Sequence, residues 1–197
     1  QSLLRNKVDT EIIAIANQYL PKTFNPGDNK NFQTLAFAAA NASYYRGNFD
    51  KTEDYINTFF LNESVDGIIL SAKISWDRGN EYSAIKRLES ALYKFPSSDK
   101  LYSELSYFYR EVDEFDSARR YAQLRNIKSP SDHEPIIDLI YLYDKYNDTE
   151  KMIQYSKQII KNFSDNEKAI FQLANFAAST GKIKIAQFCY ELALEKD

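Results

Sequence analysis

Few side chains in this sequence have the types and spacing that catalysis or metal binding requires. His133 is the sole histidine and stands beside Asp132 and Glu134, so a metal site built on two histidines is excluded. We expect an exposed His133 without a catalytic role, because a lone histidine near a helix start is usually a surface residue. Cys189 is the sole cysteine, which excludes an intramolecular disulfide and a multi-cysteine zinc site. We expect it to be a small buried apolar residue.

The carboxylates are numerous, but they are scattered at the spacing of solvated helix surfaces. Examples are Glu53 with Asp54 and Glu191 with Glu195, and neither pair predicts general acid-base catalysis. Residues 26–29 lack the alternating oxygen ligands of a calcium loop and are interpreted as a turn. No glycine-rich phosphate loop is present. We therefore expect a protein that is not an enzyme and that has no catalytic residues, no metal and no cofactor.

One basic cluster raises the question of nucleic acid. It consists of Arg119, Arg120, Arg125 and Lys128. Acidic residues at 113, 114 and 116 directly precede it, and the whole chain has 25 Lys+Arg against 28 Asp+Glu, a net charge of −3. We expect surface pairing at i to i+4 spacing to cover most of these charges, and no nucleic-acid partner.

The composition favours helices over a β-sandwich. Only 5 Gly and 5 Pro are available for tight turns, whereas 13 Phe, 15 Tyr and 1 Trp supply core volume among the 197 residues. No run approaches the ~20 apolar residues of a membrane span, so we expect no direct membrane insertion.

A repeat is the most informative pattern in the chain. Turn residues occur at Gly47, Gly79, Asp113, Asn147 and Gly181, with spacings of 32, 34, 34 and 34. Amphipathic stretches precede each turn, and others follow it at 50–61, 82–95, 116–127, 150–163 and 184–195. A period near 34 predicts a stack of helical hairpins. Because helices of about fourteen residues, ~21 Å long, cannot bury their apolar stripes alone, stacking must stabilise them.

The sequence resembles the tetratricopeptide repeat family, most clearly at 79–85 (Gly-Asn-Glu-Tyr-Ser-Ala-Ile) and on to Pro96. That family places small residues where the two helices of a hairpin cross. The matching pairs here are Ala40 with Thr52, Ala72 with Ala84, Ser106 with Ala118, and Ala174 with Ala186. The fourth hairpin has Ile140 and Met152 instead, so we expect its helices to be splayed or shifted. The resemblance implies an all-α fold, a right-handed superhelical solenoid of about five such repeats.

The resemblance also implies the domain organisation. Residues 1–30 are expected to form an extra N-terminal helix and a loop, a cap or a partial repeat, and residues 31–197 five hairpins. The hairpin bounds are about 32–64, 65–98, 99–132, 133–166 and 167–197. The last stretch has only a narrow polar face, and a terminal repeat needs a solvated one. A homo-oligomer contact, or continuation of the repeat array, is therefore expected at the C-terminal end.

In this family the first helix of each hairpin lines a concave wall, so the resemblance places the binding site there. The expected peptide-binding residues are Phe37, Asn41, Tyr44, Tyr45, Lys73, Trp76, Tyr107, Arg110, Tyr141, Phe171 and Asn175. The wall is unusually aromatic, and large exposed apolar area usually marks a contact site. Asn41 and Asn175 can hydrogen-bond to the backbone of an extended peptide. The alternative is that several rings, especially Tyr44 and Tyr107, pack between neighbouring hairpins.

The carboxylate clamp of chaperone-binding family members is not matched, because Phe37 replaces its lysine and Ser103 and Tyr107 stand where further cations belong. We therefore expect a non-catalytic scaffold that binds a protein partner, as a peptide or a helix, in an aromatic-lined concave groove. One alternative is self-assembly through the apolar C-terminal repeat. Another is the recruiting segment of a larger enzyme or secretion assembly.

Overall fold

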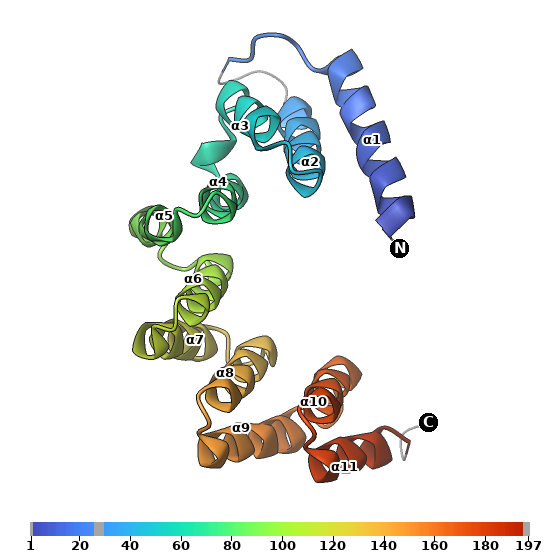
Figure 1. The fold of residues 1–197 in the computed structure, drawn as a ribbon, viewed down its shortest axis with the longest axis vertical. Coiled ribbons are helices and arrows are strands. Elements are labelled where there is room, and N and C mark those ends of the chain that lie inside the picture. The colour runs from blue at the N-terminus through green and yellow to red at the C-terminus, as the bar shows by residue number, and fades with distance from the viewer. Residues whose placement is uncertain (1, 26–29, 195–197) are drawn as a thin grey trace. The chain divides into compact units, whose positions relative to one another are not determined.

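In the computed structural model, residues 2–25 and 30–194 are described, and they form helices without strands. The α-helices are α1 (Ser2–Tyr19), α2 (Lys30–Tyr45), α3 (Phe49–Thr58), α4 (Val65–Asp77), α5 (Glu81–Lys94), α6 (Asp99–Glu111), α7 (Phe115–Lys128), α8 (Glu134–Lys145), α9 (Thr149–Asn162), α10 (Glu167–Ser179) and α11 (Ile183–Leu194). A short 3₁₀ helix, η1 (Leu61–Glu63), follows α3. Figure 1 shows the helices as successive antiparallel pairs. The predicted all-α fold of helical hairpins preceded by an extra helix is confirmed.

The five predicted turn residues end the first helices of the hairpins in the left-handed conformation. Gly47, Gly79 and Gly181 have φ of 72°, 78° and 73°, and Asp113 and Asn147 have 59° and 60°. In each turn the following backbone N–H donates to a carbonyl five residues earlier, for example Lys182 N to Ala177 O at 2.7 Å. This is a Schellman closure, which satisfies the last carbonyls of a helix. The repeated turn therefore has one physical cause in all five hairpins.

The small residues expected at the helix crossings are buried, and two of them add polar contacts. Thr52 Oγ1 lies 3.4 Å from Ala40 O, and Ser106 Oγ donates to Ala118 O at 3.0 Å. The splaying expected for the fourth hairpin was wrong. Ile140 and Met152 are buried at its crossing, and α8 contacts α9 as extensively as the two helices of the first, second and fifth hairpins contact each other. The larger side chains are accommodated by packing into the surrounding core.

The chain divides into two compact units, residues 1–101 and 102–197. The core of unit 1 gathers side chains from α1 to α4, including Ala16, Ala39 and Leu70, and that of unit 2 is formed mainly by α8 to α11. Within each unit the first helices of neighbouring hairpins contact each other, α2 with α4 and α8 with α10 (Figure 1). Each unit thus has one layer of first helices on which the expected binding residues lie.

Candidate protein-interaction site

Unit 2 exposes aromatic rings on three successive first helices. Tyr107 on α6 is 44% exposed, Tyr141 on α8 is 41% exposed, and Phe171 on α10 is 62% exposed. Tyr107, Tyr141 and Asn175 occupy the same position in their hairpins, at intervals of 34 residues. Rings that remain in solvent on a folded domain are ready to bury area against a partner. These positions are the strongest part of the expected site.

The neighbours of these rings hold them without covering them. The Arg110 guanidinium lies 5.1 Å from the centre of the Tyr107 ring and pairs with Glu111 at 3.3 Å. The Tyr141 ring packs edge-on against buried Phe176, with centroids 4.8 Å apart. Asn175 is exposed, so its amide can donate and accept hydrogen bonds. The combination suits a ligand that offers both apolar side chains and backbone groups.

The expected residues of unit 1 are more engaged with the protein itself. Tyr44 Oη donates to Asp77 Oδ2 at 2.5 Å, which joins the first two hairpins. Tyr45 is 57% exposed, but the Arg5 guanidinium of α1 lies 3.7 Å from its ring centre. Asn41 is half-buried and its Nδ2 donates to Phe37 O at 2.9 Å, within its own helix. Tyr44 thus contacts the next hairpin through its hydroxyl, and binding of a ligand at Tyr44 stays a prediction.

Three further expected residues of unit 1 are half-buried. Phe37 packs against the core, and Lys73 and Trp76 already interact with other residues. The structure thus leaves Phe37, Asn41, Lys73 and Trp76 less accessible than the rings of unit 2.

Ion pairs join consecutive first helices, α4 with α6 and α8 with α10. Lys100 pairs with Asp66 at 2.6 Å, and Lys168 pairs with Glu134 at 2.5 Å, each 34 residues along the chain. Burial raises the pKa of Glu134, but hydrogen bonds from Lys168 and Gln172 outweigh it and lower the pKa overall. Such pairs contribute little energy at a surface but specify register.

The environment of His133 differs from the exposed position that we expected. His133 is buried, with Nε2 2.8 Å from Gln172 Oε1 and Nδ1 3.3 Å from Asn166 Nδ2. Asn166 Oδ1 also accepts from Ala169 N and so caps α10. Since the Asn166 amide points its nitrogen at the ring, His133 Nδ1 is the acceptor and Nε2 the donor. The histidine joins α8 to α10 and has a structural role.

Arg125 likewise does not belong to a solvated basic surface. It is 8% exposed, and its Nη1 donates to Asp138 Oδ2 at 2.7 Å while Nη2 lies 3.3 Å from Asp132 Oδ2. Burial raises the pKa of Asp138, an effect that the charge of Arg125 opposes. The expectation of i to i+4 surface pairing was wrong for this residue, because its partners are Asp132, seven residues later in the junction, and Asp138 of the next hairpin. Arg119 does pair locally, with Asp116 at 3.0 Å.

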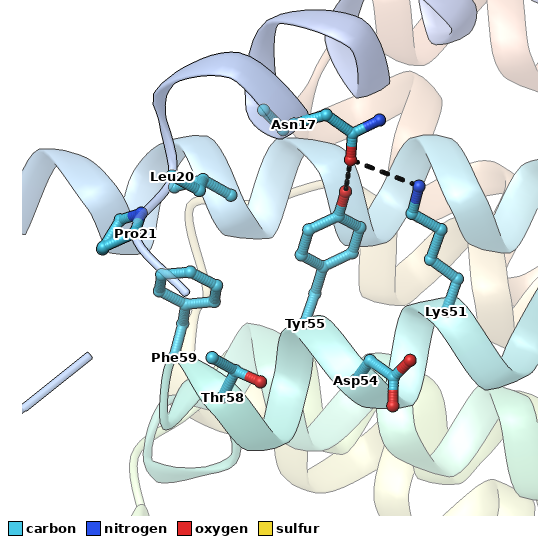
Figure 2. A pocket seen from close by; sticks show the side chains of 9 residues that line it. Asn17, Leu20, Pro21, Lys51, Asp54, Tyr55, Thr58 and Phe59 are labelled. Carbon is cyan, nitrogen blue, oxygen red and sulfur yellow. Dashed lines mark hydrogen bonds between the residues drawn. The ribbon is translucent and has the colours of Figure 1, made fainter. Parts of the chain in front are cut away.

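A pocket between α1 and α3 was not expected from the sequence (Figure 2). It has a volume of about 240 Å³, and Leu20, Pro21 and Phe59 form its apolar side. On the opposite side Asn17 Oδ1 accepts from Tyr55 Oη at 3.3 Å and from Lys51 Nζ at 3.4 Å (Figure 2). Burial raises the pKa of Tyr55. The sequence feature that could have indicated this pocket is Asn17, a polar residue near the end of an otherwise apolar helix pattern.

No group of three or more His, Cys, Asp or Glu side chains in the described part of the chain is placed to hold a metal ion. Among the helices described, none has both the length and the apolar character to cross a bilayer. Residues 26–29, for which a turn was predicted, and the side chains of Phe188 and 192–197 lie outside the described residues.

Comparisons with known proteins support the fold. No protein-family model and no curated protein matches the sequence. Among solved structures, a human IFIT1 dimer with PPP-AAAA matches with a TM-score of 0.61 and 18% identity, over 83% of this chain and 41% of IFIT1. A crystal structure of MamA matches with a TM-score of 0.56 and 19% identity, over 80% of this chain and 93% of MamA. Pseudomonas aeruginosa PilF matches with a TM-score of 0.56 and 11% identity, over 94% of this chain and 90% of PilF.

All three are tetratricopeptide repeat proteins, so the likeness confirms the fold that the sequence predicted. The chain spans half or less of the length of the IFIT1 chains that it matches. The PPP-AAAA ligand belongs to IFIT1, and the expectation that this chain binds no nucleic acid stays a prediction.

Proposed function

Because the chain has the helical-hairpin fold of tetratricopeptide repeat proteins, we propose that it is a non-catalytic scaffold that binds a protein partner through its first helices. The ligand is an extended peptide or a partner helix. Its apolar side chains pack on the aromatic rings, and its polar groups hydrogen-bond to Asn175 and, through Oδ1, to Asn41. The observation that supports this most is the exposure of Tyr107, Tyr141 and Phe171 on consecutive first helices.

The energy of such a contact comes mainly from the rings. Tyrosine and phenylalanine bury large areas with few rotatable bonds, which makes them frequent anchors of interfaces. Arg110 lies beside Tyr107 and pairs with Glu111, and Lys145, four residues after Tyr141 on α8, pairs with Asp113 at 2.9 Å. A ligand therefore meets apolar anchors with a polar rim, the arrangement typical of specific protein interfaces.

A peptide-display selection tests this proposal. Peptides enriched on the wild-type chain should bind at least about tenfold more weakly to the Tyr107→Ala/Tyr141→Ala/Phe171→Ala variant, since each lost anchor costs ~1 kcal/mol or more. The matched control is Ile127→Ala/Ile153→Ala, which removes exposed apolar side chains from the second helices α7 and α9. Equal affinity of all three proteins, or no enriched peptide, contradicts the proposal. Circular dichroism verifies that each variant is folded.

Self-assembly is a second candidate, favoured by exposed apolar side chains on α11. Ile183 is 73% exposed and Tyr190 is 44% exposed. If these residues join copies, sedimentation should show a mass that rises with concentration and falls to the monomer in Ile183→Glu/Tyr190→Glu. A monomer at every concentration contradicts it. The third alternative is that the chain is a recruiting segment of a larger enzyme or secretion assembly. The full-length reading frame of the gene would test it.

A further inference from the structure

The outer face of α5 departs from the repeat pattern in two ways. The first concerns Tyr82, which lies three residues after the turn residue Gly79 and is 75% exposed. The same position holds Asp50 in α3, Asp116 in α7 and Glu150 in α9. A carboxylate suits the first turn of a helix because it interacts favourably with the helix dipole. In α5 this position holds an exposed ring, and the first-turn carboxylate is Glu81, one residue earlier. The last second helix, α11, has Lys184 at this position.

The second departure is Arg87, eight residues after its turn residue. The second helices α3, α7 and α9 carry a tyrosine at this position and α11 carries Cys189. In α7 and α9 the ring stacks on a tyrosine of the first helix. Tyr121 stacks on Tyr109 with centroids 5.6 Å apart, and Tyr155 stacks on Tyr143 at 5.5 Å. Arg87 is instead exposed. Each other arginine in the described ranges has an ion pair, a hydrogen bond or a ring contact, and Arg87 has none of these.

These two residues border one shallow hollow on the helix surface. It has a volume of about 390 Å³ and is lined by Tyr82, Ser83, Lys86, Arg87 and Ser90. Lys86 Nζ donates to Tyr82 Oη at 3.1 Å, which raises the pKa of the lysine and keeps it charged. The lining holds two cations and two hydroxyls beside a ring, and no carboxylate.

The face continues toward the end of the helix with Tyr93 and Lys94. Tyr93 is 92% exposed, and Lys94 is exposed as well. With Lys86 and Arg87, α5 carries three cations against two carboxylates, Glu81 and Glu89, together with two exposed rings, on a chain whose net charge is −3. The local charge is opposite to that of the whole protein.

We propose that the outer face of α5 is a second interaction surface, which binds an acidic segment of a partner protein. Carboxylates of that segment pair with Arg87 and Lys86, and its apolar side chains pack on Tyr82 and Tyr93. Arginine is suited to this role because its planar guanidinium binds a carboxylate through two parallel hydrogen bonds. The surface is separate from the first-helix positions of the proposed function.

An acidic protein segment fits better than nucleic acid. The Lys86 ammonium lies 5.3 Å from the centre of the Tyr82 ring, so one face of that ring is not open for base stacking. Three cations on an otherwise acidic chain also provide little of the charge that neutralising a phosphate backbone requires. The moderate charge density of an acidic peptide matches the surface more closely.

The probe is a short fluorescent peptide rich in glutamate with a few leucines. Its counterpart has every glutamate replaced by glutamine, and a single-stranded oligonucleotide serves as the rival ligand. Fluorescence anisotropy should show binding of the glutamate peptide that weakens with salt, and at least about tenfold weaker binding to Lys86→Glu/Arg87→Glu. Amide shifts in NMR spectra should map the peptide to residues 81–94. Tyr82→Ala/Tyr93→Ala should weaken binding by a smaller factor, about threefold to tenfold.

The matched control is Lys157→Glu/Lys161→Glu, which makes the same charge change at exposed lysines of α9. It should retain wild-type affinity within a factor of about two. The proposal is overturned if no binding is found up to about 1 mM, if the glutamine peptide binds equally, or if the shifts map elsewhere. Tighter binding of the oligonucleotide through the same residues would assign the face to nucleic acid. The triple variant with alanines at positions 107, 141 and 171 should bind the acidic peptide normally, which separates this test from that of the proposed function.

Discussion

The same place in the repeat is filled by an apolar pair in unit 1 and by an ion pair in unit 2. Phe59 and Arg125 both lie twelve residues after the turn residue of their hairpins, and Leu70 and Asp138 both lie nine residues before the next one. Phe59 and Leu70 belong to the core of unit 1. Arg125 and Asp138 are joined by a hydrogen bond of 2.7 Å in unit 2.

The difference shows that the repeat specifies where helices meet but leaves open which interaction joins them. An apolar pair gains free energy from burial alone. A largely buried ion pair must first lose hydration, and its attraction roughly offsets that cost. The ion pair is therefore expected to stabilise unit 2 less than the apolar pair stabilises unit 1, although removing one partner is harmful.

The largest expected effect follows from removing Arg125. Arg125→Ala leaves Asp138 half-buried without its cation, and we expect the free energy of unfolding to fall by about 2 to 3 kcal/mol. Urea unfolding followed by circular dichroism measures this change. Trp76 fluorescence reports on unit 1, because Trp76 is the sole tryptophan and lies on α4. If the units unfold independently, the fluorescence transition should stay where it is in the wild type.

The control transfers the apolar pair of unit 1 into unit 2. Arg125→Phe/Asp138→Leu should be within about 1 kcal/mol of the wild type or more stable, because no charge is left without a partner.

A second control breaks an exposed ion pair. Arg78→Ala removes the pairing of Arg78 with Asp50 at 2.8 Å and with Glu53 at 2.7 Å, and it should lower the free energy of unfolding by less than about 1 kcal/mol. Equal losses for Arg78→Ala and Arg125→Ala would contradict the difference between the two sites.

A second repeat position holds a buried titratable group in each unit. Tyr55 and Cys189 both lie eight residues after a turn glycine, Gly47 and Gly181. Burial raises the pKa of both, and that of the Cys189 thiol rises from 9.0 to about 11. The folded state therefore holds these protons more tightly than the unfolded state.

Alkaline pH should consequently destabilise unit 2 before unit 1. As pH rises above 9.0, the unfolded thiol ionises first, so stability is lost until the folded pKa near 11 is reached. The loss should amount to about 2 kcal/mol. Unfolding of the wild type and of Cys189→Ala, measured from about pH 8 to about pH 10.5, should show a steeper decline for the wild type. Tyr55→Phe should change the decline only above pH 10, and parallel declines for all three proteins would argue against this origin.

Local features of the sequence were sufficient to predict much of the fold. Gly47, Gly181 and the other turn residues are identifiable because glycine, asparagine and aspartate tolerate the left-handed conformation that ends each first helix. The predicted second helices match within one residue at their described ends, except that α3 ends at Thr58. There η1 follows, and an added Cβ at Gly67 would lie 1.9 Å from Leu61 O. That close approach joins η1 to the first turn of α4 and requires a residue without a side chain at position 67.

The environments that were missed depend on residues far apart in the chain. His133 is buried because Gln172 and Asn166, more than thirty residues later, supply hydrogen bonds on both sides of its ring. The partners of Arg125 and the pocket formed by Asn17 and Lys51 likewise join separate helices. A period identifies the helices that meet, but not the side chains that lie opposite one another. The exposure of Tyr107 and Phe171 shows which expected residues remain accessible, and binding at them stays a prediction.

The smallest expected effect concerns the arginine that lies beside an exposed tyrosine ring in each unit. The Arg5 guanidinium of α1 lies 3.7 Å from the centre of the Tyr45 ring in unit 1. The Arg110 guanidinium lies 5.1 Å from the centre of the Tyr107 ring in unit 2 and belongs to the same helix. Arg5→Ala should lower the free energy of unfolding by only about 0.5 to 1 kcal/mol, the usual strength of an exposed cation–π contact. It should nevertheless speed the nitration of Tyr45 by tetranitromethane, measured by peptide mass spectrometry, and leave Tyr107 unchanged. Arg110→Ala should do the reverse. If Tyr45 reacts equally fast with and without Arg5, the contact with α1 does not shield the Tyr45 ring.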